Sequence, residues 1–342
     1  MTKIRIVDVA TRANVSKSTV SQYLNGRFGH MSLKTKENIR LAVEALNYVP
    51  NPIARSLKSD KTKTIGVIVR DITGFNTSRI LRGIDDFCKS NDYNVLIYNT
   101  DFDENIERRS LVTLKQMCVD GIIITSTGKN ANLINDYVAS GFPMVQFQLE
   151  YEDCHTNMVL SDYRQAARNA TEYLIELGHT RICFLTQCFE GNLSRTERYK
   201  GYQDALNAHD IDVEKGLVQY WKRDLGFEQS PVSLLQTVDA PTAFFTQHLA
   251  ITTDLLKELH QEGIEIPQQV SIVGFDEIPM VEMFKVPVTV IQQDSYKIGS
   301  QSAQLLLNEL TNDVQMGFIT NKQKVIVPCT LVERKSCRNI EI

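Results

Sequence analysis

The sequence predicts an α/β protein in which a small helical head precedes a larger body built on parallel sheets. Residues 6–47 place their apolar side chains at helical spacing, and from residue 64 short apolar runs alternate with amphipathic segments. Charge divides at the same point, because residues 1–63 hold 12 Lys and Arg against 4 Asp and Glu, whereas the remainder holds 25 against 37. The head therefore has the charge of a polyanion binder, and the body does not.

Residues 6–25, IVDVATRANVSKSTVSQYLN, predict two short helices packed on each other as a helix-turn-helix. Residues 14–16 break the apolar pattern between them. Ser16 is suited to N-cap the second helix, and Gly26 is suited to end it. The positions expected in the shared core are Val9, Ala10, Ala13, Val20 and Leu24.

The second of these helices carries hydrogen-bonding side chains opposite its apolar face. Ser18, Ser21, Gln22 and Asn25 follow the i, i+3, i+4, i+7 spacing, with Lys17 beside them. Such a stripe suits base edges and phosphates in the major groove of DNA. The alternative is an ordinary helical hairpin whose polar face is merely solvated.

A third helix is expected over residues 32–47, where the sequence SLKTKENIRLAVEALN repeats apolar positions at helical spacing. The dipeptide Val49-Pro50 then ends it. In the next segment Asn51 can N-cap a helix and Pro52 fits its first position. A helix this short is unstable alone, so we expect it to order only against a partner, unless it is a solvated linker. The apolar positions of the third helix are Ile39, Ala42, Val43 and Leu46.

The body alternates predicted strands and helices, as a parallel α/β protein does. Open sheets of this kind bind small molecules at the carboxyl ends of their strands, which favours a sensor. Helices are expected at 78–90, 163–177 and 248–261. Strands are expected at 65–69, 94–98, 121–125, 144–147, 182–185, 243–246 and 271–273.

Several function classes lack support in the sequence. No GxGxxG, HExxH or GxSxG motif occurs, and the six histidines are dispersed, so we expect no enzyme, no cofactor and no metal. The seven cysteines contain no CxxC pair, which favours reduced thiols. No apolar run of 18 residues and no signal peptide are apparent, so a cytoplasmic protein without a membrane partner is expected.

The segments IVDVATRANVSKSTVSQYLNG, NYVPNPIARSLKS and KTIGVIV together resemble the LacI/GalR family of bacterial transcription regulators, and the resemblance runs to about residue 334. It implies that two copies of the short helix pair in the minor groove, where Leu57 wedges between base pairs with Ala54, Lys58 and Asn51 beside it. It implies base reading by Lys17, Ser18 and Gln22. Many relatives carry Arg where Gln22 stands, and Gln suits adenine rather than guanine. The phosphate or sugar contacts that it implies are Ser16, Thr19, Ser21, Asn25, His30, Thr35 and Tyr48.

The segments ATEYLIELGHTRICFL, SRTERYKGYQDAL, IPQQVSIVGFDEIP and VTVIQQDSYKIGSQSAQLLLNEL are similar to the periplasmic-binding-protein-like effector domain of that family. This implies a DNA-binding domain at 1–50, a hinge at 51–63 and an effector domain at 64–342. The effector domain would divide into subdomains at about 64–160 with 292–321, and 161–291 with 322–342. The residues implied to contact the effector in the cleft between them are Asp71, Thr73, Phe75, Gln146, Gln148, Arg198, Gln247, His248, Asp276 and Gln293.

Two departures from the family pattern suggest a changed pocket. Gln247-His248 stands where relatives commonly have Asn-Asp, and MVQFQLEYED replaces an apolar run ending in Asp-Arg. We expect His248 to be able to carry positive charge, which with Arg198 favours an acidic sugar. The run beginning IVRDITGFN also resembles regulators of ketogluconate or hexuronate breakdown.

The expected function is therefore a homodimeric repressor that binds palindromic operator DNA and is controlled by a sugar or sugar-acid effector. A tetramer is left open. The alternatives are a sugar-binding or sugar-modifying protein with an incidental helical head, and an architectural DNA binder that needs no cleft.

Overall fold

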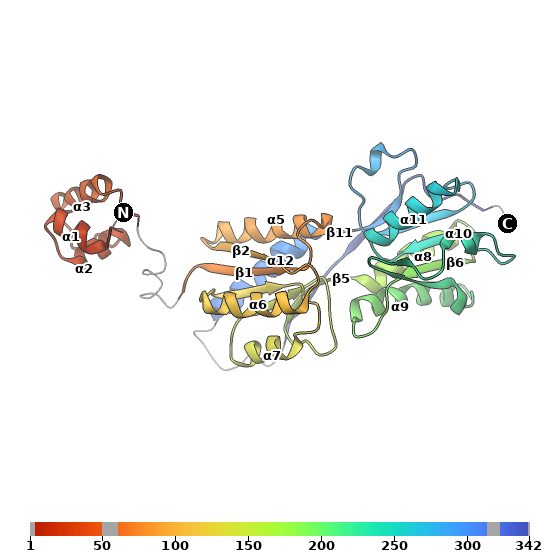
Figure 1. The fold of residues 1–342 in the computed structure, drawn as a ribbon, viewed down its shortest axis with the longest axis horizontal. Coiled ribbons are helices and arrows are strands. Elements are labelled where there is room, and N and C mark those ends of the chain that lie inside the picture. Colours follow the sequence, from red (N-terminus) through yellow and green to blue (C-terminus); the bar gives the residue numbers. More distant parts are fainter. Residues whose placement is uncertain (1–3, 50–60, 313–321, 341–342) are drawn as a thin grey trace. The chain divides into compact units, whose positions relative to one another are not determined.

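The computed structural model describes residues 4–49, 61–312 and 322–340, in two compact units that we treat separately: a head, residues 1–62, and a body, residues 63–342 (Figure 1). Within the described residues, no helix has the length and apolar character needed to cross a membrane.

The head consists of α1 (Ile6–Ala13), α2 (Lys17–Leu24) and α3 (Leu33–Ala45). The predicted helix ends are confirmed, because the Ser16 side chain caps the start of α2 and Gly26 follows its end with a φ of 68°. Leu24, predicted in the core, packs half-buried against it. The fully buried residues are Val9, Ala10, Ala13, Val20, Ile39 and Ala42.

The body contains two sheets. The first is parallel throughout, in the order β12-β5-β4-β3-β1-β2. Its strands are β1 (Thr64–Val69), β2 (Asn94–Asn99), β3 (Gly121–Ile124), β4 (Met144–Phe147), β5 (Asn157–Ser161) and β12 (Lys324–Val327). Because successive side chains of a strand point to opposite faces, β1 packs Ile65 and Val67 against α5 (Phe75–Ser90) and α12 (Ser295–Asn312) on one face. Ile68 packs against α6 (Glu104–Gln116) and α7 (Ala131–Ala139) on the other.

The second sheet has the order β13-β11-β10-β9-β6-β7-β8, with antiparallel pairing at both edges. Helices α8 (Tyr163–Glu176) and α9 (Leu193–Ala208) cover one face, and α10 (Pro231–Leu235) and α11 (Leu249–Gln261) cover the other. Short 3-10 helices stand at Lys215–Leu217 and Val281–Met283. The strands are β6 (Ile182–Thr186), β7 (Val218–Lys222), β8 (Gly226–Phe227), β9 (Ala243–Thr246), β10 (Ser271–Phe275), β11 (Thr289–Gln293) and β13 (Cys329–Val332).

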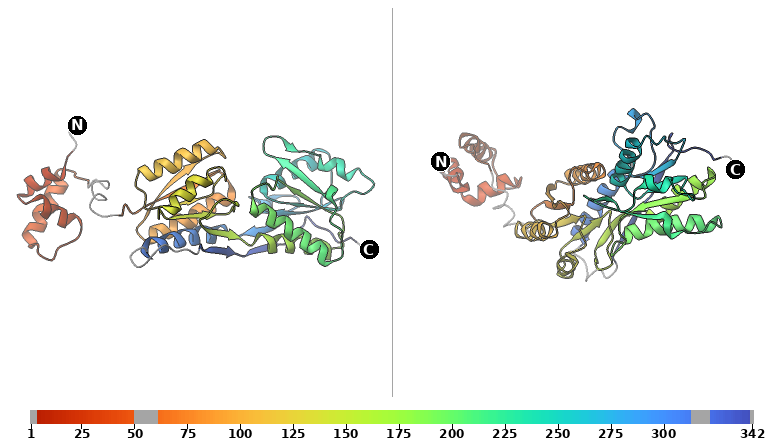
Figure 2. Two further views of the ribbon diagram at one scale, coloured as in Figure 1. Left: turned by 90° about the horizontal axis from the view of Figure 1, so that it is seen from below. Right: turned by 45° about the vertical axis from the view of Figure 1, so that its right-hand side comes forward.

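Within the described ranges the chain passes between the two sheets three times, after β5, after β11 and between β12 and β13 (Figure 2). The last passage differs from the predicted boundary at residue 322, because residues 324–327 pair with β5 in the first sheet. Only from Cys329 does the chain belong to the second sheet.

Two pairs of helices cross with their backbones in contact, and a glycine lies at each crossing. A Cβ on Gly299 of α12 would lie 2.0 Å from the carbonyl oxygen of Ile80 in α5, and one on Gly83 would lie 2.2 Å from that of Tyr296. In the second subdomain, a Cβ on Gly201 of α9 would lie 2.1 Å from the carbonyl oxygen of Arg164 in α8. These crossings fix the helices from which cavity residues project.

Candidate functional site

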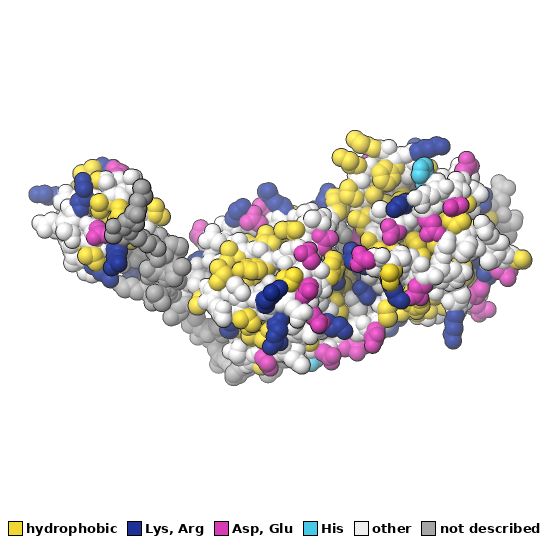
Figure 3. Space-filling view, viewed as in Figure 1, with side chains coloured by type: hydrophobic (Ala, Val, Ile, Leu, Met, Phe, Trp, Pro, Cys, Tyr) yellow, Lys and Arg dark blue, Asp and Glu magenta, His cyan; other side chains and the backbone are white. Residues whose placement is uncertain are grey.

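The exposed face of α2 carries the side chains predicted to read bases. Lys17, Ser18 and Gln22 are exposed there, and basic side chains are spread over the visible face of the head (Figure 3). Asn25 is also exposed, but its Nδ2 donates a hydrogen bond to the Ser21 carbonyl oxygen at 2.9 Å. Lys17, Ser18 and Gln22 are therefore accessible to DNA, although Ser18 Oγ shares a hydrogen bond of 2.6 Å with Ser16 Oγ, and the contact of all three with bases stays a prediction.

The residues predicted to contact phosphates have mixed surroundings. Ser16 is exposed, but its Oγ already accepts from the Thr19 N–H at 3.1 Å as the cap of α2, and His30 is exposed. The half-buried members of the set are Thr19, Ser21, Thr35 and Tyr48. The residues predicted to act in the hinge lie outside the described residues; they are Asn51, Ala54, Leu57 and Lys58.

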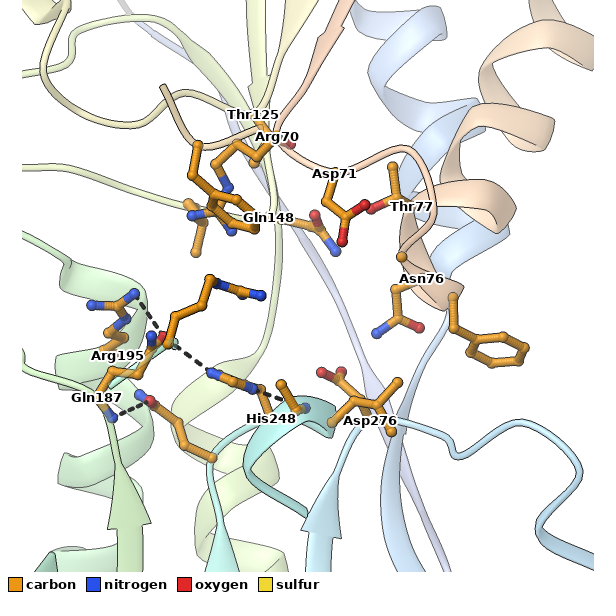
Figure 4. Close-up of a pocket in the computed structure, with 18 of the residues that line it drawn as sticks. Arg70, Asp71, Asn76, Thr77, Thr125, Gln148, Gln187, Arg195, His248 and Asp276 are labelled. Atoms are coloured by element: carbon orange, nitrogen blue, oxygen red, sulfur yellow. Dashed lines mark hydrogen bonds between the residues drawn. The ribbon is translucent and has the colours of Figure 1, made fainter. Parts of the chain in front are cut away.

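A cavity of about 630 Å³ lies between the two subdomains of the body, and we call it the first cavity. It forms where the strands of both sheets end, so the segments after β1, β4, β9 and β10 contribute side chains to it. Figure 4 shows Arg70, Asp71 and Gln148 on one side of it and Gln187, His248 and Asp276 on the other. This is the edge at which open α/β sheets bind ligands.

The structure brings most of the predicted effector residues to this cavity, and two lie elsewhere. Thr73 is exposed and its Oγ1 donates to Asp71 at 2.6 Å, so it holds the loop and does not line the cavity. Gln146 is still within β4, where its side chain is buried and donates to the Thr156 hydroxyl at 3.0 Å. The predicted residues that line the cavity are Asp71, Phe75, Gln148, Arg198, Gln247, His248, Asp276 and Gln293.

His248 begins α11, and its hydrogen bonds require a neutral ring. The Ala250 N–H donates to Nδ1 at 3.2 Å, so the ring proton resides on Nε2 and is donated to Gln187 Oε1 at 3.0 Å. Burial, and next the charge of Arg198, lower the pKa of His248 well below its ordinary value. The expectation that His248 supplies positive charge is therefore wrong.

Arg198 and Asp276 lie close together at the base of the cavity. The Arg198 guanidinium lies over the rings of Tyr163 and Phe275, at 3.9 and 4.4 Å from their centroids. Gln293 donates to Asp276 Oδ1 at 2.5 Å. Burial raises the pKa of Asp276, and the charge of Arg198 opposes that rise. The pair offers both a hydrogen-bond donor and an acceptor to a polar ligand.

Three further arginines, which the sequence analysis did not single out, line the cavity. The guanidinium groups of Arg70 and Arg223 lie over the Phe102 ring, at 5.1 and 4.1 Å. Arg195 donates to the Cys188 carbonyl oxygen at 2.8 Å. Burial lowers the pKa of Arg70 and that of Arg195, the latter to about 10, and repulsion by neighbouring arginines adds to both shifts. The positive charge in the cavity thus comes from four arginines and not from His248, and four aspartates line the same cavity: Asp71, Asp224, Asp254 and Asp276.

The sequence could have indicated two of these arginines as cavity residues. Arg70 directly follows β1, next to the predicted Asp71, and Arg195 lies one helical turn before Arg198. Arg223 follows β7, a strand that the sequence analysis did not predict.

A second cavity of about 590 Å³ adjoins the first. It is lined by residues 127–129 of the loop after β3, by the first two residues of α7, by residues 151–153 and by residues 190–192. Arg70, Phe102 and Arg195 line both cavities.

Comparison with known proteins gives two family matches. The model described as bacterial regulatory proteins, lacI family, matches residues 5–51, and that of a periplasmic binding protein-like domain matches residues 171–337. The probable HTH-type transcriptional regulator EndR of Paenibacillus polymyxa is 34% identical over 310 residues, which cover 90% of this chain and 91% of the relative. The HTH-type transcriptional regulator KdgR of Bacillus subtilis is 28% identical, with coverages of 90% and 91%.

Solved structures show the same architecture. The lac repressor dimer bound to operator and an anti-inducer superposes with a TM-score of 0.83 over 98% of this chain and 100% of that one, at 23% identity, which speaks for the fold alone. A putative ribose operon repressor from Burkholderia thailandensis has a TM-score of 0.68 at 27% identity, covering 79% of this chain and 98% of that one.

Proposed function

The chain belongs to the LacI family of bacterial regulatory proteins, and we propose that it represses carbohydrate catabolism genes under the control of an acidic sugar bound in the first cavity. As a member of that family it is a DNA-binding transcriptional regulator. The observation that supports an acidic ligand is that four arginines line one cavity: Arg70, Arg195, Arg198 and Arg223.

Within the described part of the chain, none of these four arginines forms an ion pair with a carboxylate. Three of the four aspartates that line the same cavity make other hydrogen bonds, since Asp71 accepts from Thr73, Asp254 accepts from the Trp221 indole at 2.8 Å and Asp276 accepts from Gln293. Charge-assisted hydrogen bonds to a carboxylate or phosphate are the interactions that such guanidinium groups favour. An anionic sugar would satisfy them better than a neutral one.

We further propose that the protein acts as a homodimer. One small helical head offers too little surface for operator-level affinity, whereas two heads reach both half-sites of a palindrome. The effector would act by population shift, binding one arrangement of the two subdomains better than the other and so changing operator affinity.

The test is a ligand screen in the presence and absence of palindromic operator DNA. Trp221 is the only tryptophan in the sequence and lines the first cavity, so its fluorescence reports binding directly. We expect hexuronates and ketogluconates to change this emission, raise the melting temperature and lower operator affinity, whereas glucose and galactose do not. Binding of neutral sugars alone would refute the acidic effector. Binding without any effect on operator affinity would refute the regulatory coupling.

Replacing the central arginine tests its role. Arg198→Gln should weaken binding of the sugar acid by about tenfold to a hundredfold, because a hydrogen bond to a charged group is worth about 1.5–3 kcal/mol. Operator affinity without effector should stay unchanged. Arg164→Gln is the control, since Arg164 is exposed and pairs with Asp204 at 2.6 Å outside the cavity. An unaltered dose-response in Arg198→Gln would exclude Arg198 from effector binding.

A further inference from the structure

We infer that the effector is an acidic disaccharide with a single carboxylate, which spans both cavities with its uronic ring in the first, its neutral ring in the second and its carboxylate at the arginines between them. This inference rests on the proposed function and specifies the ligand of that site.

The two cavities together have the form of one extended site. Each has roughly the volume of a small-ligand pocket, about 300–1,000 Å³, and they meet at Arg70, Phe102 and Arg195. A monosaccharide acid placed at the junction would occupy one cavity and leave the other to water. Two linked rings would reach both.

Both cavities and the junction hold buried donors that have no hydrogen-bond partner among the residues that the structure describes. In the first, Arg198 Nε and Gln247 Nε2 have none, and Arg70 Nε at the junction has none. In the second, Asn192 is 2% exposed, its Oδ1 caps α9 by accepting from the Arg195 N–H, and its Nδ2 has no partner. An unmade buried hydrogen bond is costly, so these groups favour a ligand with acceptor oxygens along its whole length.

Charge distinguishes the junction from the far end of the second cavity. The junction holds two guanidinium groups, which attract a carboxylate. Away from the junction, the lining of the second cavity holds Glu152, Asp153 and Glu190 against Lys129 alone, so a second carboxylate placed at that end would be repelled. The ring in the second cavity is therefore neutral.

The experiment compares dissociation constants, measured by Trp221 fluorescence, for uronic acids, their disaccharides with a neutral sugar, diuronides and cellobiose. Glucuronate, glucuronosyl-xylose, galacturonate and digalacturonate serve as the acidic probes. We expect the aldobiouronic acid to bind at least tenfold more tightly than the monosaccharide acid, the diuronide or cellobiose. Equal affinity for the monosaccharide acid would overturn the extended site while leaving the proposed function intact. Equal affinity for the diuronide would overturn the single carboxylate. If no acidic probe binds, the proposed function itself fails.

A variant separates the second cavity from the first. Asn192→Ser keeps a capping oxygen at the start of α9 and removes the Nδ2 donor. It should weaken binding of the disaccharide by about tenfold, toward the affinity of the monosaccharide acid. Binding of the monosaccharide acid itself should stay unchanged. Asn207→Ser, exposed on the same helix, is the control. Equal weakening of both ligands by Asn192→Ser would show that Asn192 supports the fold and does not contact the second ring.

Discussion

At the scale of single residues, the buried His179 makes folding dependent on pH. It lies between α8 and β6, where its Nδ1 is 2.8 Å from the Thr242 hydroxyl and its Nε2 is 3.2 Å from the Arg338 carbonyl oxygen. A carbonyl can only accept, so Nε2 carries a proton. Burial lowers the pKa of His179 from 6.5 to about 4.

Between pH 6.5 and 4 the unfolded chain therefore binds a proton at this histidine that the folded chain does not. The free energy of unfolding falls as pH falls through this range. By linkage this histidine alone should remove about 2 kcal/mol of unfolding free energy between pH 7.5 and pH 5. Urea unfolding at the two pH values should show a smaller loss for His179→Gln than for the parent chain. His209→Gln, an exposed histidine, should match the parent. Parallel pH dependence in all three proteins would contradict this assignment.

The residue scale also shows where sequence reasoning about the site succeeds and where it fails. The resemblance implied that Gln148 and Asp276 contact the effector, and both line the cavity, where they directly follow parallel strands that end at one edge. The protonation of His248 could not be predicted, since it depends on an N–H two residues ahead and on Gln187 from another strand end. Tertiary burial decided that charge.

At the scale of elements, the crossing of α5 and α12 should be intolerant of a methyl group. Gly299→Ala would place Cβ 2.0 Å from a carbonyl oxygen of α5, so the two helices must separate. Although alanine favours a helix by up to about 1 kcal/mol over glycine, overpacking typically costs about 1–3 kcal/mol or more, and the net change should be destabilising. Thermal unfolding of the body should show a lower melting temperature. Gly216→Ala is the control, because no atom lies within 4 Å of its Cβ. A stability of Gly299→Ala equal to that of the control would refute the close crossing.

Elements differ in how far their sequence predicts them. Helices α1 to α3 and strands such as β4 carry their own periodicity and caps, so they could be placed to within a few residues. Six strands were not predicted: β5, β7, β8, β11, β12 and β13. Of these, β8, β12 and β13 lie at sheet edges, whereas β5, β7 and β11 lie inside their sheets, so an edge position explains only half of the misses. Which sheet β12 joins depends on pairing with β5, a contact more than 160 residues away in sequence that local spacing does not encode.

At the scale of the whole molecule, the charge division between head and body determines how operator binding responds to salt. The head has a large excess of Lys and Arg and the body an excess of Asp and Glu, so phosphates should be neutralised by head residues alone. The logarithm of operator affinity should fall steeply with the logarithm of salt concentration, by about 0.9 for each neutralised phosphate.

Lys17→Ala isolates this contribution. Lys17 is exposed at the start of α2, where a positive charge opposes the helix dipole, so its removal should not destabilise the head. In a dimer both heads lose a charge, and the salt slope should become shallower by about 2. The measurement is fluorescence anisotropy with labelled operator between 50 and 200 mM salt, a range chosen because several phosphate contacts give roughly a thousandfold change across it. Lys200→Ala, which removes a body lysine that pairs with Glu197 at 2.7 Å, should leave the slope unchanged. If Lys200→Ala shifts the slope as much as Lys17→Ala does, the body also contacts DNA phosphates, and the division of labour inferred from the charges is wrong.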